Sequence, residues 1–282
     1  MKNLALRTLT GVLYVAALVG CALGGELPFF VFFLVVGALS TWEFITNVNA
    51  HDEATANRFI ATAATVAFMA AFHECCHPDH ITYAHFLPFV VTLLYLLVSE
   101  LYRNEPHPLK NWAYAFAAQL YIALPLSMIY LLGIRYDPAQ GLTSYNGWLP
   151  LSIFFFLWTS DTGAYLCGSA FSRFVPAKLF PRISPNKSWI GSIGGGVLVV
   201  LLAVALNYLL PEVRLPLPVW IGLGLTVCVF GTWGDLVESL FKRQLGIKDS
   251  GKILPGHGGM LDRFDSAFLA IPAAVIYLQF AA

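Results

Sequence analysis

The sequence has 282 residues, of which 58% are hydrophobic and only 11% are charged. A soluble domain carries about 25% charged residues, so this chain has too few polar side chains to cover a water-exposed surface. Its 16 basic residues balance its 16 acidic ones, and its five cysteines are scattered. The composition therefore excludes a soluble globular domain and a disulfide scaffold, and it predicts an integral membrane protein.

Nine apolar segments are candidates for membrane-spanning helices, each of which needs about 20 residues. Backbone amides in lipid must be paired internally, and the segments show no alternation with period 2, so we expect helices and not strands. The segments are Leu9–Gly25, Leu27–Thr46, Phe59–Phe72, Phe86–Leu101, Trp112–Leu132, Trp148–Leu166, Ile190–Leu210, Leu217–Phe241 and Phe264–Ala281. The expected fold is all-α, with about nine transmembrane helices and a cytoplasm-facing polar pocket.

No linker or low-complexity tract interrupts the chain, so we expect one membrane domain over residues 1–282. Residues 1–147 supply the N-terminal helices, and residues 148–282 supply the polar motifs. Nine crossings with a cytoplasmic N-terminus place 14 of the 16 basic residues inside, leaving only Arg135 and Arg214 outside. This asymmetry follows the positive-inside rule. It also makes residues 168–189 and 242–263 cytoplasmic loops.

The segment His73-Glu74-Cys75-Cys76-His77 fits the zinc-binding pattern H-E-x-x-H, which predicts an intramembrane metalloprotease as an alternative function. Two observations weigh against it. Pro78 is expected to end the helix that would carry both histidines. The segment is also expected to be a histidine-rich, solvent-facing outer loop. We therefore interpret the match as accidental and expect the segment to be dispensable for activity.

Glycines recur at Gly191, Gly194, Gly195 and Gly196 in the seventh predicted helix. No strand is predicted before them and no Walker lysine follows, so we expect no nucleotide-binding loop here. Small residues that allow two membrane helices to approach closely are the better interpretation.

Ionisable residues at membrane depth are costly and usually functional. Three such clusters lie in Trp158–Tyr165, Ser184–Trp189 and Gly234–Asp265. Their candidate site residues are Asp161, Ser184, Lys187, Ser188, Asp235, Ser239, Lys242, Arg243, Lys248, Asp249, His257, Gly258, Gly259, Asp262, Arg263 and Asp265. A transporter could use the same ionic residues, but we find no internal repeat of the kind that many transporters show.

The third cluster has a pattern that suits phosphate chemistry. Asp235, Ser239 and Lys242 stand at i, i+4 and i+7, so they share one helix face. Asp262 and Asp265 stand at i and i+3, and a return loop can bring them against that face. Carboxylates from separate helices suit a hard cation such as Mg²⁺, and lysines with glycine amides suit phosphate oxygens. The pattern predicts a phosphoryl- or nucleotidyl-transfer centre.

The motif Ser239-x2-Lys242-Arg243-x4-Lys248-Asp249-x-Gly251-x2-Leu254-Pro255-Gly256-His257-Gly258-Gly259-x2-Asp262-Arg263-x-Asp265 spans 27 residues. It resembles the signature of the CDP-diacylglycerol synthase (phosphatidate cytidylyltransferase) family. Ser160-Asp161-Thr-x-Ala164-Tyr165 and Ser184-Pro185-x-Lys187-Ser188 resemble that family's other two motifs, in the right order. Upstream of Leu157, the resemblance rests on hydropathy and Arg7-x2-Thr10-Gly11 alone.

The resemblance implies that CTP and phosphatidic acid give CDP-diacylglycerol and pyrophosphate. It implies that Asp235 and Asp262 bind Mg²⁺, beside which a second cation is compatible. Asp161, Asp249 and Asp265 are further candidate ligands or orienting acids. Lys187, Lys242, Arg243, Lys248 and Arg263 would hold phosphates, and His257 would contact phosphate or anchor the loop. We expect a bilayer and a homodimer as partners, no nucleic acid, and a bacterial inner membrane with the active site on its cytoplasmic side.

Overall fold

The computed structural model describes residues 2–77, 82–137, 141–171, 173–256 and 258–281. The chain divides into two compact units, each with its own internal packing. Unit 1 comprises Met1–Gly147 and Gln244–Phe264, and unit 2 comprises Trp148–Arg243 and Asp265–Ala282. Helices dominate both units, as the hydropathy of the sequence predicts.

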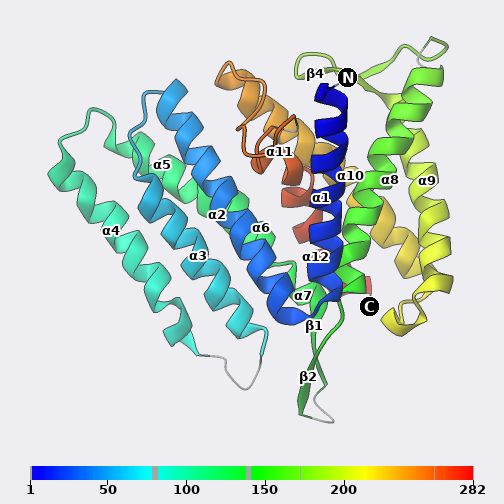
Figure 1. Cartoon of the computed structure of the whole chain (residues 1–282), viewed down its shortest axis with the longest axis horizontal. Helices are drawn as coiled ribbons and strands as arrows, with labels where there is room; N and C mark the ends of the chain where they lie inside the picture. The colour runs from blue at the N-terminus through cyan, green and yellow to red at the C-terminus, as the bar shows by residue number, and fades with distance from the viewer. Residues whose placement is uncertain (1, 78–81, 138–140, 172, 257, 282) are drawn as a thin grey trace. The chain divides into compact units, whose positions relative to one another are not determined.

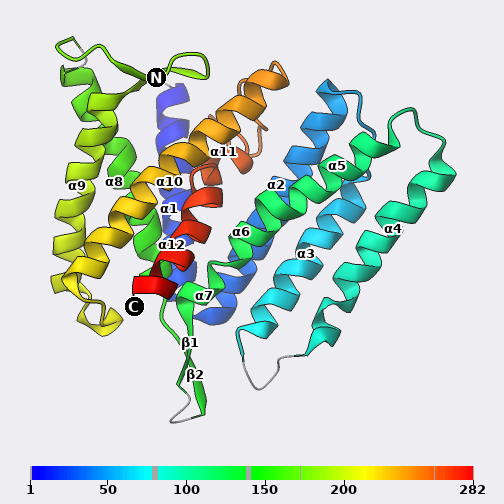
Figure 2. The same cartoon turned by 180° about the vertical axis from the view of Figure 1, so that it is seen from behind.

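Unit 1 is built around three neighbouring helices, α2, α3 and α4, which lie side by side (Figure 1). Its helices are α1 (Lys2–Leu23), α2 (Glu26–His51), α3 (Arg58–Cys75), α4 (Leu87–Arg103), α5 (Pro108–Ala118), α6 (Leu124–Ser127), α7 (Tyr130–Gly133) and α11 (Leu261–Phe264). Seen from behind, α5 and α6 run across α2 and α3 (Figure 2). The short helix α11 returns to α2, where Phe264 packs edge-on against Phe33 with ring centroids 6.0 Å apart.

The predicted helix Trp112–Leu132 is interrupted in the structure. A π-helical turn, η3 (Gln119–Ala123), separates α5 from α6. Pro125 has no N–H and its ring clashes with the carbonyl four residues earlier, which explains why the regular α-helix gives way at this point. After α7, the antiparallel strands β1 (Ile134–Asp137) and β2 (Leu142–Tyr145) form a hairpin. A 3-10 turn, η2 (Tyr83–Phe86), leads into α4.

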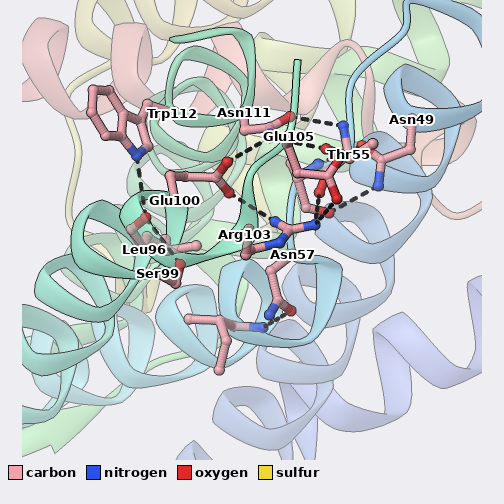
Figure 3. A network of polar contacts seen from close by, with 12 residues as sticks. Asn49, Thr55, Asn57, Leu96, Ser99, Glu100, Arg103, Glu105, Asn111 and Trp112 are labelled. Atoms are coloured by element: carbon pink, nitrogen blue, oxygen red, sulfur yellow. Dashed lines mark hydrogen bonds and ion pairs between the residues drawn. The ribbon is translucent and has the colours of Figure 1, made fainter. Parts of the chain in front are cut away.

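A polar network ties the connection between α2 and α3 to the ends of α4 and α5 (Figure 3). The buried carboxylate of Glu100 pairs with Arg103 at 2.7 Å and accepts a hydrogen bond from Asn111 Nδ2 at 2.8 Å. Asn111 in turn accepts from the Thr55 amide, and Arg103 donates to the Thr55 carbonyl. Because each charged or polar group in the network has a partner, the connecting loop can be buried here without unpaired groups.

Unit 2 contains four long helices and one hairpin. They are α8 (Trp148–Phe171), the strands β3 (Lys178–Phe180) and β4 (Ser184–Ser188), α9 (Trp189–Leu209), α10 (Leu217–Gln244) and α12 (Ala267–Ala281), with a 3-10 turn, η4 (Pro211–Val213). The last residue of α10, Gln244, is counted with unit 1. Helices α8 and α9 pack along their lengths (Figure 1).

Glycines bring α8 and α9 into close contact, which confirms the helix-packing interpretation of the glycine repeat. A Cβ added at Gly195 would lie 2.7 Å from the backbone oxygen of Ser160, and one at Gly163 would lie 2.8 Å from Gly195 Cα. Side chains at these positions would therefore force the helices apart. Gly196 is different, because an added Cβ would meet nothing within 4 Å.

All nine predicted apolar segments are helical, with shifts of a few residues at their ends. Six helices in the described residues are long and apolar enough to cross a membrane, by length and composition. They are Glu26–His51, Tyr83–Arg103, Pro108–Gly133, Trp189–Leu209, Leu217–Gln244 and Leu261–Ala281, and the apolar part of α1, Thr8–Leu23, is shorter. The two hairpins were not predicted, because they are short and lie between the apolar segments.

The expectation for the end of α3 is wrong in one respect. The helix does end at Cys75, shortly before Pro78, but the turn continues because the His77 amide donates to the Glu74 carbonyl at 3.1 Å. Both histidines therefore stay on one side of the chain. His73 is also buried, with 8% of its surface exposed, and not solvent-facing.

Replacing Gly195 with alanine should destabilise unit 2, since overpacking a close contact costs about 1–3 kcal/mol. The matched change Gly196→Ala should be neutral or slightly stabilising, because alanine favours the helix and has open space there. Thermal unfolding in detergent measures both. Equal melting temperatures for the two variants would contradict the glycine-mediated contact.

Candidate active site

The second and third motifs meet in unit 2 through a direct ion pair. Lys187 Nζ, at the end of β4, lies 2.6 Å from Asp235 Oδ2 on α10. The same ammonium donates to the Thr232 carbonyl at 3.4 Å. Ser239 lies one turn after Asp235 and donates to its Oδ1 at 3.1 Å. Asp235 and Ser239 therefore share one face of α10, as the spacing predicts. Lys187 and Ser239 together orient the Asp235 carboxylate.

Two further acids reach the same cluster from other elements. Asp265, just before α12, interacts electrostatically with Asp235, Lys242 and Asp161. Asp161, on α8, interacts with Lys187 and Asp235. The lack of a side chain at Gly234 allows Asp265 to approach α10. A Cβ at Gly234 would lie only 2.6 Å from the Asp265 backbone oxygen. The structure thus gathers three predicted acids and two predicted lysines in unit 2.

A cavity of about 200 Å³ opens beside the ion pair. It is lined by Ser160, Asp161, Ala164, Tyr165, Asn186, Lys187, Ser188, Gly191, Ser192 and Thr232. Ser188 is buried and caps α9, since its Oγ accepts from the Gly191 amide at 3.2 Å. Polar groups from the first two motifs therefore share one small cavity, which suits a polar ligand.

Lys242 has a partner that the sequence analysis did not single out. It forms an ion pair with Glu238, one turn earlier on α10, and Glu238 is fully buried. An acid with no exposed surface needs such a counter-charge. The signal was available in the sequence, because Glu238 is an ionisable residue within an apolar helix.

The loop between α10 and α11 belongs to unit 1, where a buried carboxylate on α2 holds it. Glu43 is 5% exposed, and its Oε2 accepts from the Leu261 amide at 2.9 Å and from Ser250 Oγ at 3.3 Å. One turn later, Asn47 Nδ2 donates to the Ser250 carbonyl at 2.6 Å. On α1, Thr10 Oγ1 donates to the Pro255 carbonyl at 3.2 Å.

Asp262 organises the same loop from within. Its Oδ2 accepts hydrogen bonds from the Ser250 amide at 2.9 Å and from the Gly259 amide at 2.7 Å. Gly258, at φ +83°, occupies a left-handed conformation that favours glycine, and a Cβ there would lie 2.5 Å from Asp262 Oδ2. One carboxylate oxygen of this predicted metal ligand therefore orders the loop backbone.

Glu43 and Asn47 were missed by sequence reasoning, although the rule that found the motifs would have found them. Glu43 is an acid in the middle of an apolar helix, and Asn47 follows it by one turn. Thr10 lies in the upstream motif Arg7-x2-Thr10-Gly11, and its contact with the loop gives that motif a structural role.

The remaining predicted residues lie mostly at the surface of their units. Arg243, Lys248, Asp249 and Arg263 are exposed, Ser184 is half-buried in β4, and Gly259 is buried in the loop. His257 lies outside the described residues. Because Arg243, Lys248 and Arg263 are exposed, a phosphate group could reach their side chains from solvent.

The acids of unit 2 suit a hard divalent cation. Asp161, Asp235 and Asp265 offer carboxylate oxygens from three separate elements, which is the ligand type that Mg²⁺ prefers. Lys187 and Lys242 compensate part of their negative charge and are suited to phosphate oxygens.

The fold and the site together define an integral membrane protein with a cluster of acids and lysines among its helices. The sequence model of the cytidylyltransferase family matches residues 5–281, so the chain belongs to that family. A phosphatidate cytidylyltransferase of Bacillus subtilis (strain 168) is 30% identical over 275 residues, covering 96% of each chain.

Other relatives have a higher identity over a shorter stretch. A phosphatidate cytidylyltransferase of Staphylococcus aureus (strain COL) is 48% identical over 130 residues, which is 45% of this chain and 48% of that protein. The chain thus spans about half the length of this relative in the match. A Haemophilus influenzae protein of the same name is 36% identical over 171 residues, covering 59% of this chain and 56% of its own.

Replacing Glu43 with glutamine should loosen the loop of unit 1 while keeping side-chain volume. The Leu261 amide and Ser250 hydroxyl would lose a charged acceptor, which is worth about 1.5–3 kcal/mol for such hydrogen bonds. Hydrogen exchange of residues 250–262 should accelerate, and the melting temperature should fall. Glu53→Gln is the matched control, because Glu53 is exposed and forms an ion pair with His107 at 3.6 Å, not with the loop. Unchanged exchange in Glu43→Gln would contradict the anchoring role.

Proposed function

We propose that this protein is a nucleotidyltransferase that joins CTP to phosphatidate, giving CDP-diacylglycerol and pyrophosphate in phospholipid biosynthesis. The observation that carries the proposal is the convergence of motif residues Asp161, Lys187, Asp235 and Asp265 on one cluster of unit 2. The family and the names of the relatives support the same reaction. The metalloprotease and transporter alternatives have no comparable support.

The reaction fits a site made of cations and oriented acids. A phosphate oxygen of phosphatidate attacks the α-phosphorus of CTP, a new P–O–P bond forms, and the bond between the α- and β-phosphates breaks. Pyrophosphate leaves with the bonding electrons. A phosphate nucleophile is already ionised at neutral pH, so a general base is not needed. Catalysis then depends on positioning and charge neutralisation, which Lys187 and Lys242 would provide together with Arg243, Lys248 and Arg263.

Asp235 and Asp262 are the proposed ligands of Mg²⁺, with Asp161, Asp265 and Asp249 as further ligands or orienting acids. When bound, the cation would neutralise charge on the triphosphate. Lys187 and Ser239 would hold the Asp235 carboxylate in one orientation. A second cation is compatible with three acids in unit 2. The hydrogen bond from the Gly259 amide to Asp262 would hold the loop backbone in one shape beside this proposed ligand.

The membrane arrangement is part of the same proposal. Nine crossings with a cytoplasmic N-terminus place both basic loops, 168–189 and 242–263, on the side where CTP is found. The bacterial relatives are consistent with a bacterial inner membrane as the location. A homodimer is compatible with this arrangement, and no nucleic-acid partner is proposed.

Asp235→Asn and Asp262→Asn should each lower the rate of CDP-diacylglycerol formation by about 100-fold or more, by analogy with the removal of one electrostatic group from an active site. Both changes keep side-chain volume but remove an anionic ligand. Mg²⁺ should raise the melting temperature of the wild type, because a ligand that binds only the folded state stabilises it, and this shift should be lost in the variants.

Glu212→Gln is the control for these variants, because Glu212 is an exposed acid in η4. It should keep normal turnover and the normal Mg²⁺ response. Near-normal turnover with lowered thermal stability in Asp235→Asn or Asp262→Asn would show that the acid is structural, and would remove it from the proposed metal site.

Single cysteines at Ala177 and Lys252 should be protected from an impermeant thiol reagent in intact cells, because both loops are proposed to be cytoplasmic. Both positions are exposed in the structure, so protection cannot come from burial within their unit. Ser144→Cys, on the β1–β2 hairpin, should react. The background would carry replacements of the five native cysteines. Labelling of Ala177→Cys or Lys252→Cys in intact cells would overturn the proposed topology.

A further inference from the structure

A second group of potential metal ligands lies at the start of α2, far along this helix from Glu43, which holds the loop between α10 and α11. Glu26 is the first residue of α2, and it faces His73 and His77 at the end of α3. One ligand atom from each of the three residues lies within 4.8 Å of the other two. Glu26 and Glu43 are 17 residues apart on one helix, so the two places are separated by about 25 Å along α2.

The distances suit a shared cation. The Nε2 atoms of His73 and His77 lie 3.0 and 2.9 Å from the same oxygen, Glu26 Oε1. Zinc binds histidine nitrogen and carboxylate oxygen at about 2.0–2.2 Å, which puts two ligand atoms of a tetrahedral ion about 3.3 Å apart. The observed distances are slightly shorter, so a small outward shift of these atoms would admit the ion.

The other ring nitrogens face acceptors. Nδ1 of His77 lies 3.3 Å from the His73 carbonyl oxygen, and Nδ1 of His73 lies 3.5 Å from Glu74 Oε1. For His77, the acceptor on this side favours the tautomer with hydrogen on Nδ1. Nε2 of His77 then presents a lone pair to Glu26, and a cation bound between these electron-rich atoms would satisfy both. Metal-bound histidines commonly have an acceptor at the second ring nitrogen.

His73 is a buried polar side chain that the fold does not satisfy. It is 8% exposed, and within the described residues neither of its ring nitrogens makes a hydrogen bond of acceptable geometry. Aromatic rings surround it, with Phe30 at 4.2 Å and Tyr130 at 5.3 Å between ring centroids. A buried, unsatisfied imidazole in an apolar shell is costly unless it binds something.

We propose that Glu26, His73 and His77 form a binding site for one divalent transition-metal ion, best matched by zinc, that clips the end of α2 to the end of α3. Two imidazoles and a carboxylate are a known zinc donor set that leaves a fourth position to water. Magnesium and calcium prefer oxygen ligands and are a poorer match. Cys76 is not among the ligands, since its thiol donates to the Phe72 carbonyl at 3.4 Å.

The site is not built as a protease. In the H-E-x-x-H pattern, the glutamate between the histidines serves as the base for metal-bound water. Here Glu74 lies beside Nδ1 of His73, whereas the proposed metal faces Nε2 of the same ring. The third ligand comes instead from α2. The motif that we interpreted as accidental therefore supplies two ligands of a metal site that is independent of cytidylyl transfer.

Zinc binding to the full-length protein in detergent tests the proposal. The protein would carry an affinity tag without histidine, be stripped with EDTA, and be loaded with zinc in excess Mg²⁺, which occupies the acidic centre of unit 2. Metal analysis after gel filtration should find about one zinc per chain, and zinc at a hundredfold excess over its Kd should raise the melting temperature by roughly 5 °C.

Glu26→Gln and His77→Gln should each weaken zinc binding by more than about 100-fold, since loss of an outer orienting group alone costs about 10–100-fold. His107→Gln is the matched control, because His107 is a partly exposed histidine of the same unit that pairs with Glu53. It should bind zinc as the wild type does. Undiminished zinc in both Glu26→Gln and His77→Gln would overturn the proposal.

A measurement on the wild type alone guards against variants that fail to fold. Cobalt should bind with a stoichiometry of one, give the visible absorption of a tetrahedral site, and be displaced by one equivalent of zinc. A wild-type protein without this absorption overturns the site regardless of the variants. Zinc-free His77→Gln should keep most of the rate of CDP-diacylglycerol formation, and loss of that rate with the metal would contradict the independence of the two sites.

Discussion

Backbone amides of the glycine-rich loop are held by carboxylates, and the shape of the signature region in unit 1 depends on this interaction. The amides of Ser250 and Gly259 donate to Asp262, and the amide of Leu261 donates to Glu43. An amide left unpaired in a dry environment costs about 1–3 kcal/mol. Two carboxyl groups can accept several such amides at once, and hydrogen bonds to a charged acceptor are stronger than neutral ones. The loop can therefore hold a fixed irregular shape beside apolar helices.

The glycines of the signature make room for those carboxylates. A Cβ at Gly251 or at Gly259 would lie 2.3 Å from an oxygen of Glu43, and one at Gly258 would lie 2.5 Å from Asp262. The glycines therefore leave space for the acids of α2 and α11, in addition to allowing unusual backbone conformations. A loop that is already ordered before substrate binds loses little further entropy when phosphates arrive, which favours tight binding.

Much of the helical fold follows from hydropathy, because backbone pairing in lipid permits few alternatives to a helix. The cluster in unit 2 was also predictable, since Asp161 and Asp235 stand out as charges in apolar segments and Lys187 lies in a basic loop just before one. Other features depend on contacts between distant parts of the chain. Glu43 and Ser250 are 207 residues apart, and no local pattern pairs them.

The same limit applies to the histidine pair. The spacing of His73 and His77 suggested a metal motif, but the third ligand, Glu26, comes from another helix and only the structure brings it there. Pro78 did not exclude a metal site as we expected. The helix ends at Cys75, but the following turn keeps His73 and His77 on the same side of the chain. Asp262 was predicted as a metal ligand, and its bonds to Ser250 and Gly259 add a structural role that its spacing did not reveal.

The most direct test of the central claim is an assay of the purified protein in detergent with phosphatidate, Mg²⁺ and one nucleotide at a time from CTP, dCTP, UTP and ATP. We predict CDP-diacylglycerol and pyrophosphate in equal amounts from CTP, only when phosphatidate and Mg²⁺ are both present. Pyrophosphate released without lipid product, or no product from CTP in a folded preparation, would contradict the account.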